Sequence, residues 1–324
     1  MIMKDRTIPL KILILVAILR RLPWSHAKFQ KIKEELARRL AGFEGEKSLD
    51  FYFRELPKEK YLIFHDLNLP DCDYNCQIDT LLLTPEFALI IDVKHMAGKL
   101  IFDTDNEQFI QINNEKEKGY PYPIAQAERH QKHIKKLLAE HHFPDVPVEY
   151  LVVLSNGYST YVVTGKNASR VKARVCKADI LLKRIEAIEN MYSKPHISSK
   201  DLRKFSRLLV KLNTPPTKYL LQKYGIQKSE IKPGVHCPLC DHLPLKREKQ
   251  KWFCPCCEEF FVDAHVEALK DYFLLFDLKI TNREFREFAQ IKSIDTAKRL
   301  LLSANLNYSG EKKSRYYFPK SFPW

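Results

Sequence analysis

Two carboxylates and one amine lie within strands that are otherwise apolar. Asp79 precedes the apolar run 81–83, and Asp92 and Lys94 follow the apolar run 88–91. Nearly continuous apolar runs of this kind, joined here by a Thr-Pro-Glu turn, are typical of strands buried on both faces. A charge at the end of a buried strand is costly unless it is paired or binds a metal. These three side chains therefore need a chemical explanation.

The spacing of the three residues allows metal-assisted chemistry. Asp92 and Lys94 are two positions apart, so in a strand their side chains point to the same face. Together with Asp79, they could hold a divalent cation through carboxylate oxygens, which Mg²⁺ prefers. The amine could position or deprotonate a water and offset charge on a phosphate, as metal-assisted phosphodiester hydrolysis requires. The simpler alternative is a surface salt bridge between Asp92 and Lys94 on an edge strand.

The residues around these strands resemble the nuclease-related domain (NERD) family, a branch of the restriction-endonuclease-like superfamily with the signature Asp-(Asp/Glu)-x-Lys. The matching pieces are GFEGEKSLD, which contains Glu46, then QIDTLLLTPEFALIIDVKHMAGKL, and finally QAERH, which contains Gln126. They extend over roughly residues 37 to 156. The resemblance implies an α-β-β-β-α-β core and Mg²⁺-dependent cleavage of DNA.

The resemblance also implies roles for individual residues. Asp79 and Asp92 would be ligands of Mg²⁺ or Mn²⁺, and Lys94 would be the catalytic lysine. Glu46 would help as an acidic group, directly or through a water, and Gln126 would make a polar contact at the edge of the site. The family often has Glu at the place of Asp92, whose side chain is one methylene shorter. This difference bears on the geometry of the metal site.

Four of the eight cysteines form two Cys-x-x-Cys pairs, CPLC and CPCC, separated by 13 residues. The four are Cys237, Cys240, Cys254 and Cys257. Two pairs at this spacing give the four thiolates of a structural zinc ribbon, with no open position for catalysis. Cys256 is surplus, and His236 or His265 could substitute, so the fourth ligand stays open. A redox role needs only one pair. The basic hairpin between the pairs could contact nucleic acid.

Residues 280–306 read as helix, tight turn, helix. Thr281 with Glu284 predicts a capping box, and Ser293 predicts the cap of the second helix. The residues expected to face inward are Phe285, Phe288, Ala289, Ile291, Ile294, Ala297, Leu300 and Leu301. Residues expected to bind DNA are Lys298 and Arg299 on the outer face of the second helix, and Lys312, Lys313 and Arg315 in a basic hairpin that follows. The segment resembles a winged helix-turn-helix, and the alternative is a helical hairpin used only for packing.

The order of the elements predicts an α/β fold with helices flanking a central mixed sheet. A double proline within residues 213–219 indicates a linker. We expect five segments: an N-terminal helical extension (1–36), the nuclease-like domain (37–192), a helical linker (193–232), the zinc ribbon (233–265) and the winged-helix-like segment (266–324).

Composition and charge narrow the class of partner. The 324 residues are 45% hydrophobic and 29% charged, which is ordinary for a globular protein of two or three domains. The net charge of +14, from 54 Lys and Arg against 40 Asp and Glu, favours a polyanion such as DNA. The apolar run 12–19 is too short to span a bilayer, which needs roughly 20 residues. We expect it to pack on the body of the protein, with an interfacial anchor as the alternative.

The leading hypothesis is a cytoplasmic, metal-dependent DNA endonuclease with zinc-ribbon and DNA-binding modules, which acts in DNA processing or repair. The cofactors would be Mg²⁺ or Mn²⁺ and one structural Zn²⁺. No stable membrane insertion is expected, and a homo-oligomer is possible. The competing hypothesis is a catalytically inactive DNA-binding or regulatory protein built on the same fold. A redox or peripheral membrane protein is a third.

Overall fold

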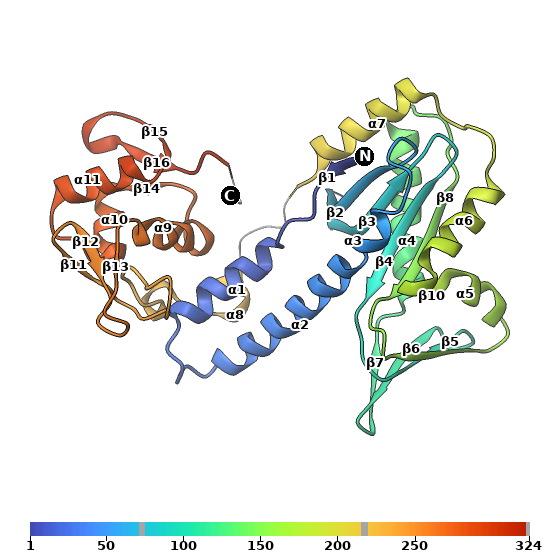
Figure 1. The fold of residues 1–324 in the computed structure, drawn as a ribbon, viewed down its shortest axis with the longest axis horizontal. Coiled ribbons are helices and arrows are strands. Elements are labelled where there is room, and N and C mark those ends of the chain that lie inside the picture. Colours follow the sequence, from blue (N-terminus) through green and yellow to red (C-terminus); the bar gives the residue numbers. More distant parts are fainter. Residues whose placement is uncertain (71–74, 215–219, 322–324) are drawn as a thin grey trace. The chain divides into compact units, whose positions relative to one another are not determined.

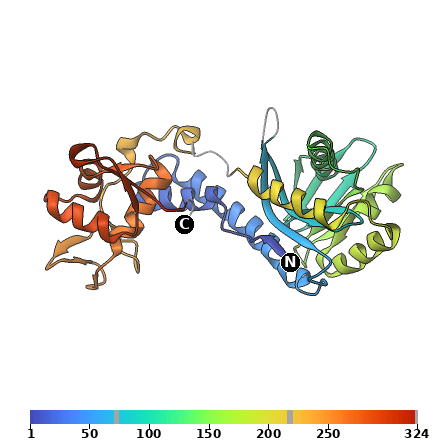
Figure 2. The same cartoon turned by 90° about the horizontal axis from the view of Figure 1, so that it is seen from above.

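The computed structural model describes residues 1–70, 75–214 and 220–321, and the chain divides into two compact units. Unit 1 comprises Met1–Ile8 and Arg39–Pro216, and unit 2 comprises Pro9–Arg38 and Thr217–Trp324. Each unit thus joins segments that are distant in sequence, as the colours of Figures 1 and 2 show. Helix α2 (Phe29–Ser48) has its first half in unit 2 and its second half in unit 1.

A six-stranded mixed sheet forms the centre of unit 1, in the order β1-β2-β3-β4-β8-β10. Its strands are β1 (Ile2–Lys4), β2 (Leu62–Pro70), β3 (Asn75–Leu83), β4 (Ala88–Lys94), β8 (Val148–Leu154) and β10 (Val175–Lys177). Strands β2, β3 and β4 are antiparallel neighbours, whereas β8 runs parallel to β4. The two strands expected around the acidic residues are therefore confirmed. The alternative of an edge strand is wrong, because β4 lies between β3 and β8.

Helices cover both faces of this sheet. On one face, the core contains apolar residues of α4 (Pro123–Glu140) and α7 (Ser199–Leu212). On the other face, it contains residues of α3 (Asp50–Phe53) and α6 (Leu181–Met191). Each fully buried Leu or Ile contributes roughly 1.5–3 kcal/mol. The continuous apolar runs of β3, β4 and β8 follow from this burial on both faces.

A smaller sheet in unit 1 has the order β7-β6-β5-β9. Its strands are β5 (Lys99–Asp103), β6 (Gln108–Asn113), β7 (Lys116–Tyr120) and β9 (Thr160–Thr164). The pairing of β5 with β6 confirms the hairpin expected for KLIFD and QFIQIN. Along the chain, α5 (Ala168–Arg174) follows β9 of this sheet and precedes β10 of the central sheet.

Unit 2 begins with the apolar N-terminal helix α1 (Leu10–Arg21), which packs into a core with α8 (Leu220–Tyr224) and α9 (Ala264–Leu275). Arg21 Nε donates to Asp271 Oδ2 at 2.8 Å, and both side chains are almost fully buried. Packing on the body, which we expected for this helix, is confirmed. Among the described residues, no helix combines the length and apolarity that crossing a bilayer requires.

The remaining elements of unit 2 are short. They are β11 (Lys246–Glu248), β12 (Lys251–Phe253), β13 (Phe260–Phe261), β14 (Ile280–Thr281), α10 (Asn282–Ala289), α11 (Ile294–Ser303), β15 (Asn307–Ser309) and β16 (Tyr316–Phe318). Strands β11, β12 and β13 form one sheet, and β14, β16 and β15 form another. Both sheets contribute to a single core with α9, α10 and α11, which contains Trp252 and Tyr317.

The helix pair α10–α11 has the caps that the sequence predicts. Thr281 Oγ1 accepts from Glu284 N at 3.2 Å, and Glu284 Oε2 accepts from Thr281 N at 2.8 Å. Ser293 Oγ accepts from Thr296 N. The expected inward residues are buried, with one correction: Ile294 is 61% exposed. Ile294 is the first residue of α11, and the buried residues of this helix begin at Ala297.

Candidate active site and metal centre

The acidic residues lie where strands β3 and β4 separate. Regular pairing of the two strands ends at Thr80 and Ile91. Beyond this pair, Asp79 Oδ2 accepts a hydrogen bond from Val93 N at 2.8 Å, in place of a backbone carbonyl. On the other side of β3, Asp66 interrupts the β2 ladder with a φ of 50°. A non-glycine residue in this region of backbone space is a feature found at functional sites.

Asp92 and Lys94 form an ion pair, but not on the surface. Lys94 Nζ lies 2.6 Å from Asp92 Oδ2, and the Asp92 side chain is only 2% exposed. Lys94 Nζ also donates to Gln126 Oε1 at 3.1 Å. Gln126 lies in the first turn of α4, which begins with Pro123. The structure therefore brings the lysine, one carboxylate and the amide together, as expected from the sequence.

Helix α2 brings Glu46 to the same cluster of charges. At Gly45 the helix passes so close to the end of β4 that a Cβ would lie 2.4 Å from His95 Cβ and 2.7 Å from Ser155 Oγ. Only glycine allows this approach. The neighbouring Glu46 lies close enough to Asp79 and Asp92 for their charges to act on its carboxyl group.

The electrostatics show that the carboxylates crowd one another. Burial, and next the charge of Asp79, raise the pKa of Glu46 to about 8. Burial, and next the charge of Asp92, raise the pKa of Asp79 to about 7. For Lys94, burial lowers the pKa, but the charges of Asp92 and Asp79 outweigh it, and the pKa ends above its ordinary value. A divalent cation would relieve this repulsion.

The donor set suits a hard cation. Glu46, Asp79 and Asp92 offer only carboxylate oxygens, the ligands that Mg²⁺ prefers. A protein donor holds each of them: the Val93 amide for Asp79, Lys94 for Asp92, and Arg6 for Glu46. Among the described residues, the three carboxylates are not grouped as tightly as the four cysteines discussed below. The three carboxylates are suitable ligands, and each would have to exchange its protein donor for the metal ion.

Sequence reasoning missed Arg6, the donor to Glu46. Its side chain is 5% exposed, and its Nη1 lies 2.9 Å from Glu46 Oε2. Its Nη2 bonds Asp50 Oδ1 at 3.1 Å and lies 2.9 Å from His65 Nδ1. Burial, and next the charge of Arg6, lower the pKa of His65 to about 4. Arg6 lies far from the motif in sequence, so no local pattern indicates it.

His130 was also missed, although a signal existed. It follows Gln126 by four positions on α4, so both side chains lie on one helix face. His130 is 8% exposed, and among the described residues its Nδ1 has no hydrogen-bond partner. Burial lowers its pKa, and the charge of Asp92 opposes this. The spacing of Gln126 and His130 could have indicated a second polar group facing the site.

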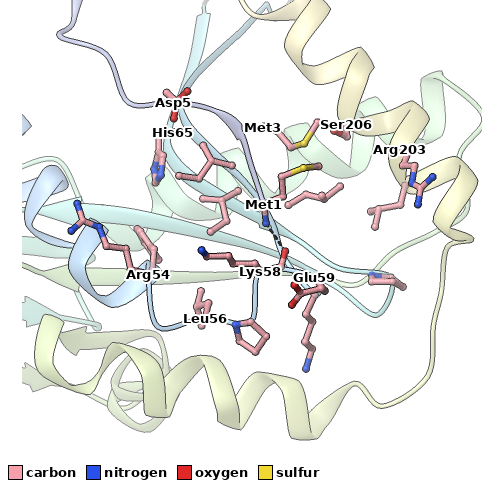
Figure 3. A pocket seen from close by; sticks show the side chains of 18 of the residues that line it. Met1, Met3, Asp5, Arg54, Leu56, Lys58, Glu59, His65, Arg203 and Ser206 are labelled. Atoms are coloured by element: carbon pink, nitrogen blue, oxygen red, sulfur yellow. Dashed lines mark hydrogen bonds between the residues drawn. The ribbon is translucent and has the colours of Figure 1, made fainter.

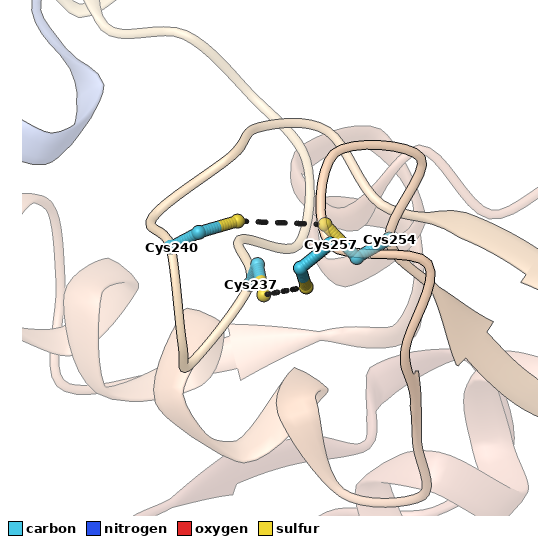
Figure 4. A group of neighbouring side chains, drawn as sticks. All are labelled: Cys237, Cys240, Cys254 and Cys257. Atoms are coloured by element: carbon cyan, nitrogen blue, oxygen red, sulfur yellow. Dashed lines mark hydrogen bonds between the residues drawn. The ribbon is translucent and has the colours of Figure 1, made fainter.

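The four cysteines form a compact group. Their Sγ atoms all lie within 4.8 Å of one another. Figure 4 shows Cys237 beside Cys257 and Cys240 beside Cys254. The two sulfurs of each pair are 3.6 Å apart. Tetrahedral Zn–S bonds of about 2.3 Å would place the sulfurs about 3.8 Å apart. The four-cysteine group could therefore bind zinc.

The alternatives for the fourth ligand lie outside this group. Cys256 is exposed. The imidazole of His236 lies 3.5 Å from an Asp271 carboxylate oxygen, and His265 stacks on Trp252 with ring centroids 6.3 Å apart. This stack is one of the contacts between the ribbon hairpin and α9, whose apolar residues share one core.

For four of the five residues expected to bind DNA, the structure shows where the side chain lies. Lys298 and Arg299 are exposed on α11, as expected, and Lys312 is exposed between β15 and β16. Arg315 stacks over the Tyr308 ring, with its guanidinium 4.8 Å from the centroid. The side chain of Lys313 lies outside the described part of the structure. The pairing of β15 with β16 confirms the hairpin that carries these residues.

Comparison with known families identifies the central part of unit 1. The model of the nuclease-related domain (NERD) matches residues 41–155, about a third of the chain. The chain therefore contains a nuclease-related domain, and the match includes Glu46, Asp79, Asp92, Lys94 and Gln126. No curated protein and no solved structure matches the chain.

Proposed function

We propose that the protein is a Mg²⁺-dependent DNA endonuclease. The observation that carries this proposal is the convergence of Glu46, Asp79, Asp92 and Lys94 where β3 and β4 separate, within a nuclease-related domain. The basic charge of the chain supports DNA as the substrate. DNA processing or repair would be the setting.

The order of elements supports a restriction-endonuclease-like core. Helix α2, strands β2, β3 and β4, helix α4 and strand β8 follow one another as α-β-β-β-α-β, with β5–β7 inserted before α4. In this proposal, residues 37–192 are the nuclease domain, between an extension (1–36) that adds strand β1 to its sheet and a linker (193–232) whose helix α7 covers one face of that sheet. Residues 233–265 and 266–324 are the zinc ribbon and a winged helix-turn-helix that share a core.

The proposed mechanism assigns a task to each side chain. Asp79 and Asp92 would hold Mg²⁺ or Mn²⁺, with Glu46 acting directly or through a water, and the bound ion would activate a water and neutralise phosphate charge. Lys94 carries a proton that its carboxylate neighbours stabilise, so its task is to offset charge on the phosphate. Gln126 accepts from Lys94 and orients the amine. Strand β4 fixes the spacing of Asp92 and Lys94 on one face.

DNA binding is assigned to unit 2. The capped helix α11 would be the recognition helix, with Lys298 and Arg299 facing the DNA. The hairpin β15–β16 would be the wing, with Lys312, Lys313 and Arg315 contacting phosphates. One structural Zn²⁺ in the four-cysteine group would hold the ribbon hairpin against this module.

Plasmid cleavage tests the proposal. Purified protein should nick or linearise plasmid with Mg²⁺ or Mn²⁺ and stop on addition of EDTA. Asp92→Asn should lose cleavage by at least about 100-fold, because it removes a ligand charge but keeps the shape. Asp145→Asn, at an exposed carboxylate of the same unit, is the matched control and should cleave normally. Equal cleavage by both variants would refute the assignment.

One observation favours the second candidate, an inactive DNA-binding or regulatory protein. Arg6 pairs with Glu46 at 2.9 Å, so a protein cation lies beside an acidic group that the mechanism needs. If this pair is permanent, the protein would bind DNA without cleaving it. DNA binding that persists in Mg²⁺ with no cleavage by the unsubstituted protein would support this candidate.

A further inference from the structure

A cavity of about 990 Å³ lies at the β1 edge of the unit 1 sheet, where nothing so far assigns a role. Strands β1 and β2 and helices α3 and α7 contribute its walls. Figure 3 shows Met1 and Met3 of the N-terminal segment between Arg54 and Lys58 on one side and Arg203 and Ser206 on the other. The volume is in the range of small-molecule sites, about 300–1,000 Å³. Asp79, Asp92 and Lys94 do not line it.

The lining combines aliphatic side chains with an excess of cations. The aliphatic and sulfur-containing residues include Met1, Met3, Leu56, Leu62 and Leu202. Six Lys or Arg face three Asp or Glu in the wall. Among the described residues, Phe53 is the one Phe, Tyr or Trp that lines the wall, which leaves little surface on which a nucleobase could stack. The lining therefore suits an organic anion with an aliphatic body.

Helix α7 supplies the best place for the charged end of such a ligand. Arg203 and Arg207 are four positions apart on the helix, both line the cavity, and both are exposed. Neither forms an ion pair among the described residues. Like charges at this spacing destabilise a helix slightly, and a bound anion would offset the repulsion. Between them lies Ser206, whose buried Oγ lacks a hydrogen-bond partner within the described part of the chain.

We propose that this cavity binds an amphiphilic organic anion, a carboxylate with an aliphatic chain. Its carboxylate lies between the guanidinium groups of Arg203 and Arg207, and its chain lies against Met3, Leu62 and Leu202. The same cavity wall includes Asp50, His65 and Arg6, and Arg6 bonds both of the other two as well as Glu46. A ligand here would thus touch the residues that hold Glu46.

Calorimetric titration of the full-length protein with sodium dodecanoate, below its micelle concentration and in EDTA, tests the proposal. We expect one dodecanoate per chain, and weaker binding of acetate, which lacks the chain, and of AMP, which replaces it with a base. The double variant R203A/R207A should weaken binding by at least about tenfold, since hydrogen bonds to charged groups are each worth about that much. Both arginines are exposed, so the fold should survive, which a thermal melt checks.

The control is K200A/K204A, which removes two charges from the same helix outside the cavity lining. It should change the dissociation constant less than about twofold, because screened charges outside the site contribute little. Equal weakening by both double variants would overturn the proposal, as would tighter binding of AMP than of dodecanoate. Because no divalent metal is present, the outcome does not depend on whether the protein is a nuclease.

Discussion

Arg6 Nη1 lies 2.9 Å from Glu46 Oε2, and this pair joins the N-terminal segment to the nuclease-related domain. Arg6 also bonds Asp50 and contacts His65 and Thr80, so a single guanidinium satisfies several polar groups that are largely removed from water. The matched family region begins at residue 41, so this charge comes from outside it. A residue from outside the matched region therefore pairs with one of the acidic residues inside it.

Arg6→Gln should destabilise unit 1. Removing one partner of a buried ion pair costs roughly 3–5 kcal/mol, and we expect the lower end because Glu46 and Asp50 keep some exposure. A divalent cation should reduce the loss, since it can neutralise Glu46 in place of Arg6. Urea unfolding with and without Mn²⁺ measures both effects. Arg54→Gln, at an exposed arginine, is the control. The same destabilisation with and without Mn²⁺ would show that no metal replaces the guanidinium.

The stability of unit 1 without metal should fall as pH rises through the range in which Asp79 titrates. Its pKa is about 7 in the folded protein and 3.8 in its ordinary state, so the folded state binds the proton more tightly. The contribution of the Asp79 proton to the free energy of unfolding is therefore fully present at low pH, and it is lost as pH rises towards 7.

Comparison with Asp79→Asn cancels the contribution of His65, which titrates in an overlapping range, and reports Asp79 together with its coupling to Glu46. Between pH 5 and pH 8, the stability of the native protein relative to Asp79→Asn should fall by at least about 1 kcal/mol, which one pKa unit already gives. Urea unfolding in EDTA at each pH provides the measurement. A difference that stays constant with pH would mean that the Asp79 carboxyl is not perturbed as the geometry indicates.

Zinc loss should loosen the helices as well as the ribbon. Leu245, Trp252 and Cys254 of the ribbon share one core with α9, α10 and α11. Cys237→Ser should lose the metal, and amide protons of α9 and α11 should then exchange faster, which hydrogen–deuterium exchange detects. Cys256→Ser, at an exposed cysteine outside the group, should keep about one zinc per chain by elemental analysis. Zinc loss from Cys256→Ser would refute the ligand set, and unchanged exchange in α9 and α11 would refute the coupling.

The sequence predicts those parts of the protein that depend on local patterns. The apolar runs of β3 and β4, the caps at Thr281 and Ser293, and the cysteine spacing each depend on a few neighbouring residues. The structure contains all of them. Local patterns did not indicate Arg6, because its contacts with Glu46 and His65 depend on how distant segments pack.

The organisation of unit 2 also could not be derived from local patterns. Helix α1 packs with α9 although more than two hundred residues separate them, through a shared apolar core and the ion pair of Arg21 with Asp271. Ile294 was misassigned because helical periodicity does not say where the first buried turn begins. Long-range packing decides both outcomes.

DNA affinity should depend on salt through unit 2. A deletion of residues 266–324 would open the core that includes Trp252, so substitutions at surface positions are the sharper test. Each phosphate contact contributes about 0.9 to the slope of log affinity against log salt. K298A/R299A should therefore lower the slope by up to about 1.8, and K312A/R315A by a similar amount, in fluorescence anisotropy with EDTA present to prevent cleavage. K31A/K33A removes the same charge from exposed positions of α2 and should leave the slope unchanged. If all three double variants behave alike, net charge alone governs binding, and α11 and the β15–β16 hairpin do not contact DNA.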